Sequence, residues 1–291
     1  MFDLIVNPIA GGKHGKVMAK KLALIESRLL ERNVDYKIHY SKIKGDATKI
    51  CKTLIDNGAT DIIAVGGDGT LHEVINGFDN FENVNMGIIP CGTGNDFASS
   101  LMLPLDVVKA VDIILDNTPK FTDFMQMPTV RGLNIIGVGM DVEVLKKYEQ
   151  LKKKTKFGYT KCLLKTLFAF KCIKFDAQLD GNKDEYLSYI AGVANGKMFG
   201  GGLQLCPVAD VSDGALDFVS VGNMSKLKLI FAFLKLKKGK ILKIKQTRHK
   251  RAESIKVELN QPYTVNVDGE LYENIPFSVQ IMHNKLKVYR V

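Results

Sequence analysis

Cysteine is sparse and irregularly spaced in this chain of 291 residues. No two cysteines form a Cys-x-x-Cys pair, and their number is odd, which argues against both a disulfide framework and a zinc site. We therefore expect reduced thiols that lie mostly in the core. The five cysteines are Cys51, Cys91, Cys162, Cys172 and Cys206.

Long hydrophobic runs are also missing. No apolar run approaches the roughly 20 residues that a membrane span requires. The first residues, Met1 to Pro8, lack the basic and apolar regions of a secretory signal, so a cytoplasmic protein is expected. Neither a P-loop pattern nor a Gly-x-Gly-x-x-Gly after the first strand occurs, so the sequence supports neither an ordinary P-loop NTPase nor an ordinary NAD site.

Acidic residues are absent between Lys226 and Arg251, and Glu149 is the only one between Lys146 and Lys174, in a chain with a net charge of +10. Both stretches alternate lysine with leucine, phenylalanine and isoleucine. This composition is typical of surfaces that meet anionic membranes, although nucleic-acid patches and ordinary solvated faces share it.

The remaining composition is that of a globular protein of about two domains, with 46% hydrophobic and 25% charged residues. Residues 1–124 alternate short apolar strands (2–6, 36–40, 62–65 and 86–89) with helical patterns (17–31, 47–57, 71–78 and 105–115), which predicts a parallel α/β domain that binds a nucleotide. Residues 125–291 turn to period-two patterns at 255–259, 263–267 and 277–281, which predicts mainly antiparallel β-structure. The C-terminal residues could pack back on the first domain.

A glycine-rich turn follows the apolar strand that ends at Val65. Gly66, Gly67 and Gly69 would let phosphates approach the backbone N–H groups at the start of the next helix. Asp68 would repel a bare phosphate, but a bound Mg²⁺ resolves this conflict. The alternative is a plain turn followed by a helix cap.

Two further glycine loops favour the phosphate site. One runs from Asn7 to Gly15 after the first strand, and the other from Pro90 to Ala98 after the fourth. In open α/β sheets, ligands bind at the carboxyl ends of the strands, and all three loops leave that edge. Three plain turns at one edge are a less economical explanation.

At these residues the chain resembles the diacylglycerol kinase catalytic family, especially its soluble bacterial lipid kinases. The resemblance extends over almost the whole chain and rests on ordered motifs at residues 7–12, 66–70, 92–98, 134–141, 194–202, 213–217 and 267–270. The Gly-Gly-Asp-Gly-Thr motif alone is less specific, because NAD kinases carry a similar one.

The resemblance implies an N-terminal Rossmann-like parallel α/β domain, a C-terminal mainly antiparallel β-sandwich domain that handles the lipid, and transfer of the γ-phosphoryl group of ATP to a lipid hydroxyl. The positions that match the family's nucleotide site are Asn7, Pro8, Gly11, Gly12, Lys13, Ser41, Gly66, Gly67, Asp68, Gly69, Thr70, Leu71, His72, Thr93, Asn95 and Asp96. Ser41 departs from the family's usual threonine but keeps the hydroxyl.

The resemblance also implies catalytic and metal roles. Glu270 matches the general base, and Asp68 is expected to act in catalysis through the Mg²⁺ that accompanies ATP. Asp213, with the backbone carbonyls of Asp210 and Ala215, matches a structural Mg²⁺ site. Asp96 and Asp123 are further candidates for the acidic cluster around the catalytic cation, and each could instead be a cap or turn residue.

Glu270 has a simpler explanation too, as the flank of an Asp268-Gly269 hairpin turn. The turn could also be what presents the base. His72 lacks the second histidine of a zinc motif. The other histidines are isolated in sequence and are expected in surface or packing positions; they are His14, His39, His249 and His283.

We expect a protein that acts peripherally on a lipid at an anionic membrane surface. No nucleic-acid partner is expected, and a homodimer is compatible with the sequence. Diacylglycerol is the favoured acceptor, and its product would be phosphatidic acid. A sphingoid base, a glycerophospholipid, or NAD as the acceptor of a related kinase stay open, as does a non-catalytic binding module. Such a module would not need Glu270 beside phosphate loops.

Overall fold

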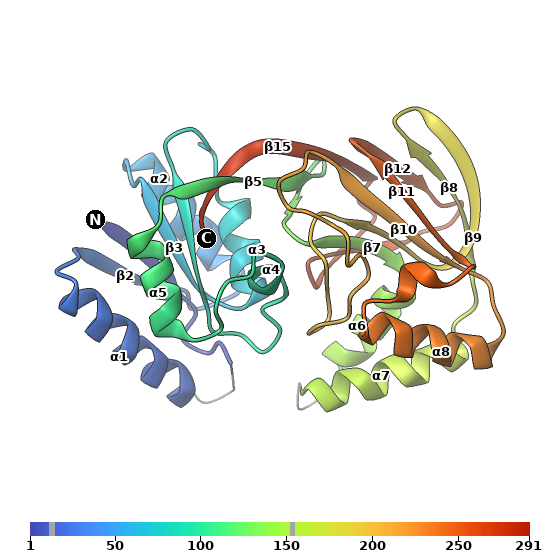
Figure 1. The fold of residues 1–291 in the computed structure, drawn as a ribbon, viewed down its shortest axis with the longest axis horizontal. Helices are drawn as coiled ribbons and strands as arrows, with labels where there is room; N and C mark the ends of the chain where they lie inside the picture. Colours follow the sequence, from blue (N-terminus) through green and yellow to red (C-terminus); the bar gives the residue numbers. More distant parts are fainter. Residues whose placement is uncertain (12–14, 152–154) are drawn as a thin grey trace. The chain divides into compact units, whose positions relative to one another are not determined.

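The computed structural model describes residues 1–11, 15–151 and 155–291, which form two compact units (Figure 1). Unit 1 contains Met1–Asp123 and His283–Val291, and unit 2 contains Phe124–Met282. The chain passes from unit 1 to unit 2 within strand β5 (Pro119–Gln126) and returns within strand β15 (Phe277–Tyr289).

Unit 1 is built on a parallel sheet. Its order is β4-β3-β1-β2, and every neighbouring pair in it is parallel. The last residues of β15 extend the sheet by pairing in parallel with β4, Lys287 opposite Asn85. The strands are β1 (Phe2–Val6), β2 (Tyr36–Tyr40), β3 (Asp61–Gly66) and β4 (Asn85–Pro90).

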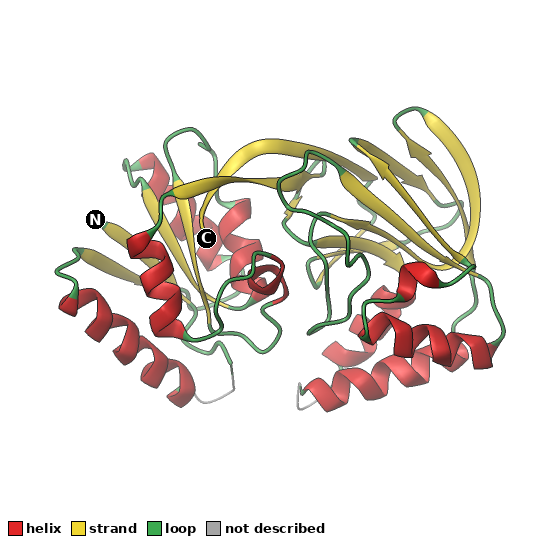
Figure 2. Ribbon diagram, in the orientation of Figure 1, coloured by secondary structure: helices red, strands yellow, loops and turns green. Residues whose placement is uncertain are grey.

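Helices cover both faces of this sheet (Figure 2). Helices α1 (Lys16–Glu31) and α5 (Val107–Asp116) share an apolar core with Leu4 and Val6 of β1, so these two helices cover one face. Helix α2 (Asp46–Asp56) packs on β1 and helix α3 (Asp68–Asn76) on β3. Since side chains alternate between the faces of a strand, Ile5 points away from that core. The predicted parallel α/β domain is confirmed.

Unit 2 is an antiparallel sandwich. Its strands follow the order β14-β13-β7-β9-β8-β12-β15, and β10 and β11 continue from β9. Strand β9 pairs with β8 through its first half and with β7 through its second, which joins the two parts of the sheet. The strands are β6 (Arg131–Gly132), β7 (Ile135–Gly139), β8 (Ile173–Leu179), β9 (Asn182–Ala194), β10 (Leu216–Gly222), β11 (Thr247–Ala252), β12 (Ser254–Glu258), β13 (Thr264–Val267) and β14 (Glu270–Glu273). The predicted β-sandwich is confirmed.

Helices in unit 2 were not predicted from the sequence. They are α6 (Met140–Glu149), α7 (Lys156–Ala169), α8 (Lys226–Lys237) and the short 3₁₀ helix η1 (Ile241–Lys243). Leu163 and Leu167 of α7 and Leu229 and Phe233 of α8 bury their side chains in one apolar cluster. Dense lysine between these apolar residues obscured the helical period. Within the described ranges, none of the helices has the length and apolar content that crossing a bilayer demands.

Candidate functional site

Two glycine turns at the carboxyl edge of the unit 1 sheet lie backbone against backbone. A Cβ atom on Gly67 would lie 2.9 Å from the Cα of Gly92, and one on Gly92 would lie 2.5 Å from the Cα of Gly67. At Gly66, a Cβ would lie 2.2 Å from the Thr70 hydroxyl oxygen. These positions therefore require glycine because the two turns approach each other so closely.

Asp68 connects these two turns. It lies in the first turn of α3, and its carboxylate accepts hydrogen bonds from the backbone N–H of Asn95 at 2.7 Å and of Phe97 at 3.2 Å. Asn95 has a positive φ of 57°, and its side-chain amide closes the loop on Gly92 through both its oxygen and its nitrogen. Asp68 thus caps the short helix α4 (Asp96–Ser100) from outside that helix.

The first glycine loop reaches the same place. The side-chain amide of Asn7 donates to the Thr70 hydroxyl at 3.4 Å, and its oxygen accepts from the backbone N–H of Ile9 at 3.1 Å. Gly11 has a φ of +77°, and a Cβ there would lie 2.8 Å from the carbonyl oxygen of Cys91. The structure therefore brings the described parts of the three loops together. Gly12 and Lys13 lie outside the described residues.

The other predicted nucleotide contacts differ in exposure. Thr93 is exposed, whereas Ser41, Leu71 and His72 are buried. The Ser41 backbone N–H donates to the carbonyl of Val6 at 3.0 Å, which fixes this serine beside the end of β1. Leu71 and His72 turn their side chains into the protein, so their contact with a nucleotide stays a prediction.

The acidic residues of unit 1 are spread over several elements. Asp96 is buried at the start of α4. Asp123 has no exposed surface and accepts from the backbone N–H of Asn284 at 2.8 Å and faces His283 Nδ1 at 3.0 Å. Across the described ranges, Asp68, Asp96 and Asp123 do not form a group with ligand atoms within 4.8 Å of one another. A joint metal site of all three stays a prediction.

Three of the histidines that are isolated in sequence form pairs with aspartates in the structure. His283 pairs with Asp123, His39 Nε2 lies 2.8 Å from Asp3, and His249 Nε2 lies 2.5 Å from Asp217. Each partner is distant in sequence or on another strand, so sequence spacing could not reveal the pairs. His14 lies outside the described residues. Four of the cysteines are buried and all five are free thiols, as expected.

In unit 2, Glu270 opens strand β14 directly after a tight turn. Asp268 and Gly269 have φ values of +53° and +97°, the left-handed conformation at both positions of a two-residue hairpin turn, and Val267 pairs with Glu270 across it. The predicted hairpin turn at Asp268-Gly269 is therefore confirmed. Glu270 is partly exposed, and the turn determines where its side chain begins.

Asp268 anchors this turn on strand β7. Its carboxylate accepts from the backbone N–H groups of Leu133 at 2.6 Å and of Asn134 and Ile135 at 2.9 Å each. Its own N–H donates to the carbonyl of Ile135 at 3.0 Å. Three charge-assisted hydrogen bonds at one carboxylate hold the hairpin in a fixed register relative to β7.

A buried polar network lies behind the hairpin. Asn266 accepts from the N–H of Gly269 at 2.8 Å and donates to the Asp141 carboxylate at 3.0 Å. Burial raises the pKa of Asp141 to about 6. Asn195 donates to the carbonyl of Leu133 at 2.7 Å. Asp141 and Asn195 belong to motifs named in the sequence analysis, but Asn266 and its contact to Asp141 were not predicted.

The predicted structural Mg²⁺ loop carries suitable oxygen atoms. Asp210 accepts from the backbone N–H and hydroxyl of Ser212, and Asp213 accepts from the N–H of Ala215 at 3.2 Å. Carboxylate and carbonyl oxygens are the ligands that Mg²⁺ prefers, so the donor types fit. Arg251 forms an ion pair with Asp213, and this cation would have to share the carboxylate with the metal ion.

Two family models match consecutive parts of the chain. The model of the diacylglycerol kinase catalytic domain matches residues 2–127. The model of the YegS C-terminal NAD kinase beta sandwich-like domain matches residues 134–290. These ranges agree with the α/β and β-sandwich folds seen in the two units.

Relatives with curated names give the same result. A diacylglycerol kinase of Bacillus subtilis is 27% identical, with 94% of this chain and 90% of that protein covered. A diacylglycerol kinase of Mycobacterium tuberculosis is 28% identical, with 98% and 94% covered. The crystal structure of a candidate diacylglycerol kinase from Bacillus anthracis superposes with a TM-score of 0.82 at 26% identity, covering 100% of this chain and 95% of that one.

Proposed function

Since the chain belongs to the diacylglycerol kinase catalytic family and is a lipid kinase by that membership, we propose that it transfers the γ-phosphoryl group of ATP to the hydroxyl of diacylglycerol, giving phosphatidic acid. The convergence of the three loops in unit 1 is the observation that carries the nucleotide part of this proposal. The acceptor is taken from the names of the relatives.

The loops suit a nucleotide because their backbones come close to one another without side chains between them. Gly67 and Gly92 leave no room for a Cβ atom, and α3 begins directly after Gly67. The N-terminus of a helix of this length favours the negative charge of a phosphate. These features support a triphosphate cradle that does not use a P-loop.

Asp68 would hold Mg²⁺ beside this cradle. Its carboxylate supplies hard oxygen ligands, and its bonds to the N–H groups of Asn95 and Phe97 fix its position. When bound, Mg²⁺ would neutralise part of the charge on the phosphates. Phosphoryl transfer passes through a loose transition state, so the chain's main tasks are to position the phosphates and the acceptor.

Glu270 would accept the proton of the lipid hydroxyl. A carboxylate suffices for this role, because little help is needed at the attacking oxygen in such a transition state. The Asp268 anchor and the hairpin support the role, since they fix the backbone from which the Glu270 side chain extends. A general base must be held within hydrogen-bond reach of the proton that it removes.

Transfer of label from γ-labelled ATP tests the proposal. The full chain is incubated with Mg²⁺ and, in separate arms, diacylglycerol, sphingosine, phosphatidylglycerol, NAD or no acceptor. We expect label in phosphatidic acid, and an initial rate of labelling about 100-fold lower with Glu270→Gln as the matched control. Label in another lipid would preserve the lipid kinase and change the acceptor. Label in no lipid would contradict the proposal.

An NAD kinase is the second candidate, because the model that matches unit 2 describes an NAD kinase beta sandwich-like domain. The motif from Gly66 to Thr70 is also shared with NAD kinases. Against it stand the lysine-rich helices, which a water-soluble acceptor would leave unexplained. Label in NADP with none in any lipid arm would decide for this candidate.

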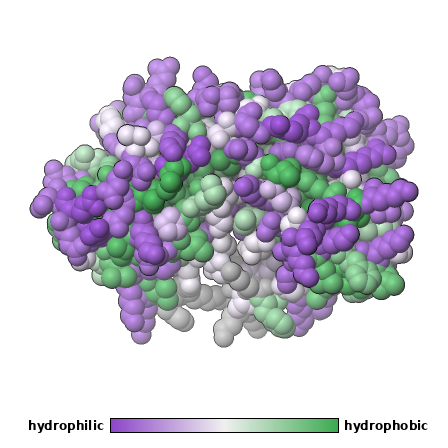
Figure 3. All heavy atoms as spheres, viewed as in Figure 1, coloured by the Kyte–Doolittle hydropathy of each residue, from purple (hydrophilic) through white to green (hydrophobic). Residues whose placement is uncertain are grey.

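Helices α7 and α8 supply the surface with which we propose that the chain meets an anionic bilayer. Six large apolar side chains on these helices are exposed; they are Phe157, Leu164, Phe168, Leu227, Phe231 and Leu234. Figure 3 shows hydrophobic and hydrophilic residues side by side over this part of unit 2, at the lower right. We call these six residues, with the exposed lysines of the two helices, the α7/α8 surface.

The lysines of α8 have separate roles. Lys226 donates to the carbonyls of Leu167 and Phe170 at 3.2 and 2.8 Å, so it caps α7 instead of facing lipid. Lys228 and Lys235 line an open hollow of about 220 Å³ together with Lys243 and Lys245. Phosphate head groups are the complementary chemistry for four lysines around one hollow. Each such charge contributes about 1 kcal/mol near an anionic surface.

Vesicle sedimentation tests the α7/α8 surface. Binding to vesicles with phosphatidylglycerol should occur at low salt and largely disappear at high salt, since the Debye length falls from about 10 Å at 0.1 M to about 3 Å at 1 M. Changing Lys235, Lys237 and Lys238 together to Glu should abolish binding and leave ATP binding intact. The matched control changes the exposed Lys20, Lys37 and Lys120 of unit 1 to Glu.

The two phenylalanines of α8 separate membrane contact from packing. Phe231 is 58% exposed and Phe233 is 8% exposed. Phe231→Ser should reduce vesicle binding without lowering the melting temperature, whereas Phe233→Ser should lower the melting temperature. Equal binding to neutral and anionic vesicles, or binding unchanged in Phe231→Ser and the triple lysine variant, would contradict the proposed surface.

A further inference from the structure

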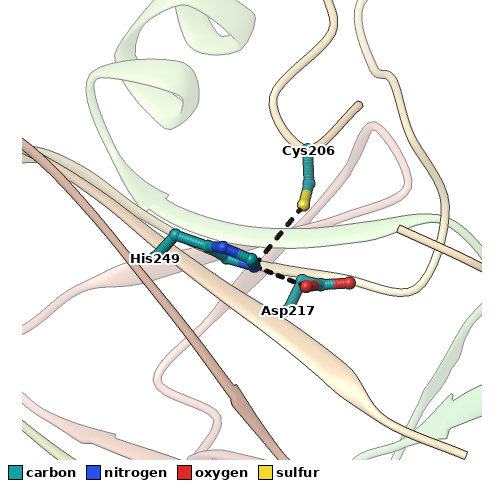
Figure 4. A group of neighbouring side chains, drawn as sticks. All are labelled: Cys206, Asp217 and His249. Atoms are coloured by element: carbon teal, nitrogen blue, oxygen red, sulfur yellow. Dashed lines mark hydrogen bonds and ion pairs between the residues drawn. The ribbon is translucent and has the colours of Figure 1, made fainter. Parts of the chain in front are cut away.

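Cys206, Asp217 and His249 meet in unit 2 (Figure 4). His249 Nε2 lies 2.5 Å from Asp217 Oδ1 and 4.0 Å from Cys206 Sγ. All three ligand atoms lie within 4.8 Å of one another, and in the described residues this is the group of three that could hold a metal ion. The three residues come from a loop, from β10 and from β11.

The strand register explains why they meet. Strands β10 and β11 are antiparallel, with Val219 opposite His249 and Asp217 opposite Arg251. Asp217, Val219 and His249 therefore face the same side of the sheet, and Asp217 and His249 are diagonal neighbours. The loop that follows β9 packs Cys206 onto this side, in an apolar cluster that includes Val219.

Two side chains of the group are buried and the third is partly exposed, an arrangement that suits a metal site. Cys206 is fully buried and the Asp217 side chain is 3% exposed, whereas the His249 side chain is 28% exposed. Two ligands are thus held rigidly in the interior, and the third lies at an opening to solvent. A metal ion can enter there, and a water molecule can complete a tetrahedron, as it does at open zinc sites.

A histidine–aspartate pair alone explains only part of the arrangement. It accounts for the buried Asp217, but not for a thiol directed at the same imidazole nitrogen. The thiol has no exposed surface, and burial raises the pKa of Cys206 to about 12, with a further contribution from the Asp217 charge, so a nucleophilic role suits it poorly. A thiol of this kind reacts poorly, but a divalent metal deprotonates it on binding.

We propose that Cys206, Asp217 and His249 form a zinc site that fastens the loop around Cys206 to strands β10 and β11. On binding, Zn²⁺ forms bonds to Sγ, Nε2 and a carboxylate oxygen, and the thiol proton goes to solvent. Tetrahedral bond lengths of about 2.0 to 2.3 Å place ligand atoms about 3.3 to 3.6 Å apart. The observed 2.5 and 4.0 Å lie on either side of that range, and each differs from it by less than about 1 Å.

The donor set separates this site from the predicted Mg²⁺ loop a few residues away. Asp210, Asp213 and Ala215 offer oxygen atoms only, which suit Mg²⁺, whereas a thiolate and an imidazole select zinc and other transition metals. The site is independent of the proposed kinase function, because none of its three residues is among those proposed to bind ATP or the lipid. Metal binding at the site can be measured without a kinase assay.

Cobalt is the probe for the test, since tetrahedral Co²⁺ is coloured and a thiolate ligand adds a charge-transfer band in the near ultraviolet. The full chain is freed of metal with a chelator, dialysed and titrated with Co²⁺. We expect one ion per chain, a sulfur charge-transfer band, displacement by Zn²⁺ but not by Mg²⁺, and a rise in melting temperature with Zn²⁺.

Variants assign the ligands. Cys206→Ser should abolish the charge-transfer band, and His249→Gln should weaken metal binding by about 100-fold or more. Cys172→Ser is the matched control, because Cys172 is the more exposed thiol of the same unit, and it should bind as the unchanged chain does. No band in the unchanged chain, or a band that persists in Cys206→Ser, would overturn the proposal. Circular dichroism checks that each variant is folded.

Discussion

Asp68 in unit 1 and Asp268 in unit 2 have the same structural role in different surroundings. Each carboxylate accepts backbone N–H groups from a segment distant in sequence and so fixes a loop at the end of a strand. Asp68 accepts from Asn95 and Phe97, whereas Asp268 accepts from three consecutive residues that begin at Leu133.

The difference lies in what stands beside each carboxylate. Gly67 and Gly94 lie next to Asp68, and a Cβ on Gly94 would lie 2.7 Å from its Oδ2, so no side chain from these two positions covers the carboxylate. Asp268 is instead the first residue of the hairpin turn that it anchors, and Glu270 follows two residues further along the chain. We infer that unit 1 places a carboxylate in the reaction itself, while unit 2 uses one carboxylate to position another.

The largest effect is expected from Asp68→Ala. Turnover should fall by about 1000-fold or more, because the cation loses a ligand and the loop from Gly92 to Phe97 loses its anchor. Unfolding should become easier by only about 1–3 kcal/mol, the cost of N–H groups without an acceptor. Steady-state kinetics over a range of Mg²⁺ concentrations and chemical denaturation measure the two effects.

Asp106→Ala is the control for this change. Asp106 also caps a helix in unit 1, accepting from the N–H of Lys109 at 3.0 Å, but it lies at the start of α5. Its loss should cost about 1 kcal/mol of stability and leave turnover unchanged. If Asp68→Ala kept near-normal turnover with an unchanged Mg²⁺ dependence, its role would be structural, like that of Asp106.

Glu270→Gln should lower kcat by about 100-fold and leave the apparent KM for ATP nearly unchanged, because the base acts on the acceptor hydroxyl. Glutamine keeps the size of the side chain and the hairpin. Single-turnover kinetics with labelled ATP separate the chemical step from binding. A large rise in the KM for ATP at normal kcat would instead assign Glu270 to nucleotide binding.

Asp268→Asn tests the other side of the comparison. An amide offers one acceptor where the carboxylate offers two, and it loses the charge, so about 2–3 kcal/mol of stability should be lost. Turnover should fall less than in Glu270→Gln, since the base is still present. If turnover fell as far with no loss of stability, Asp268 would act in the reaction and the proposed division between the units would fail.

The two units also differ in how much the sequence could predict. Strands β1 to β4 of unit 1 were expected within one residue at each end, whereas β5 and the end of β15 were not. The loops of unit 1 could be assigned to one edge because parallel strands share the direction of their ends. Helix α3 begins at Asp68, three residues before the expected start at Leu71, since the polar first turn carries no apolar signal. A periodic pattern cannot show where such a turn begins.

Contacts between distant segments could not be predicted. The bond of Asp268 to Leu133 spans 135 residues of chain, and that of Asp141 to Asn266 spans 125. The absence of Cys-x-x-Cys argued against zinc, but Cys206 and His249 meet through strand register and loop packing, which no local spacing encodes. Spacing rules exclude local metal motifs and leave assembled ones open.

The smallest effect is expected from Asp141→Asn, and it depends on pH. Burial raises the pKa of Asp141 from 3.8 in the unfolded chain to about 6 in the folded one. The folded state therefore binds more protons between these values, and stability from this group is present below pH 3.8 and lost as the pH rises through 6.

Asparagine stays neutral and can still accept from Asn266, so Asp141→Asn should match the unchanged chain near pH 4 and exceed it in stability by about 1–2 kcal/mol near pH 8. Denaturation midpoints at both pH values give the difference. A variant that is less stable than the unchanged chain at pH 8 would mean that the Asp141 charge is compensated in the fold. The charge of Asp141 would then stabilise the fold, as the charges of Asp68 and Asp268 are expected to do. Asp141 would no longer differ from those two residues in this respect.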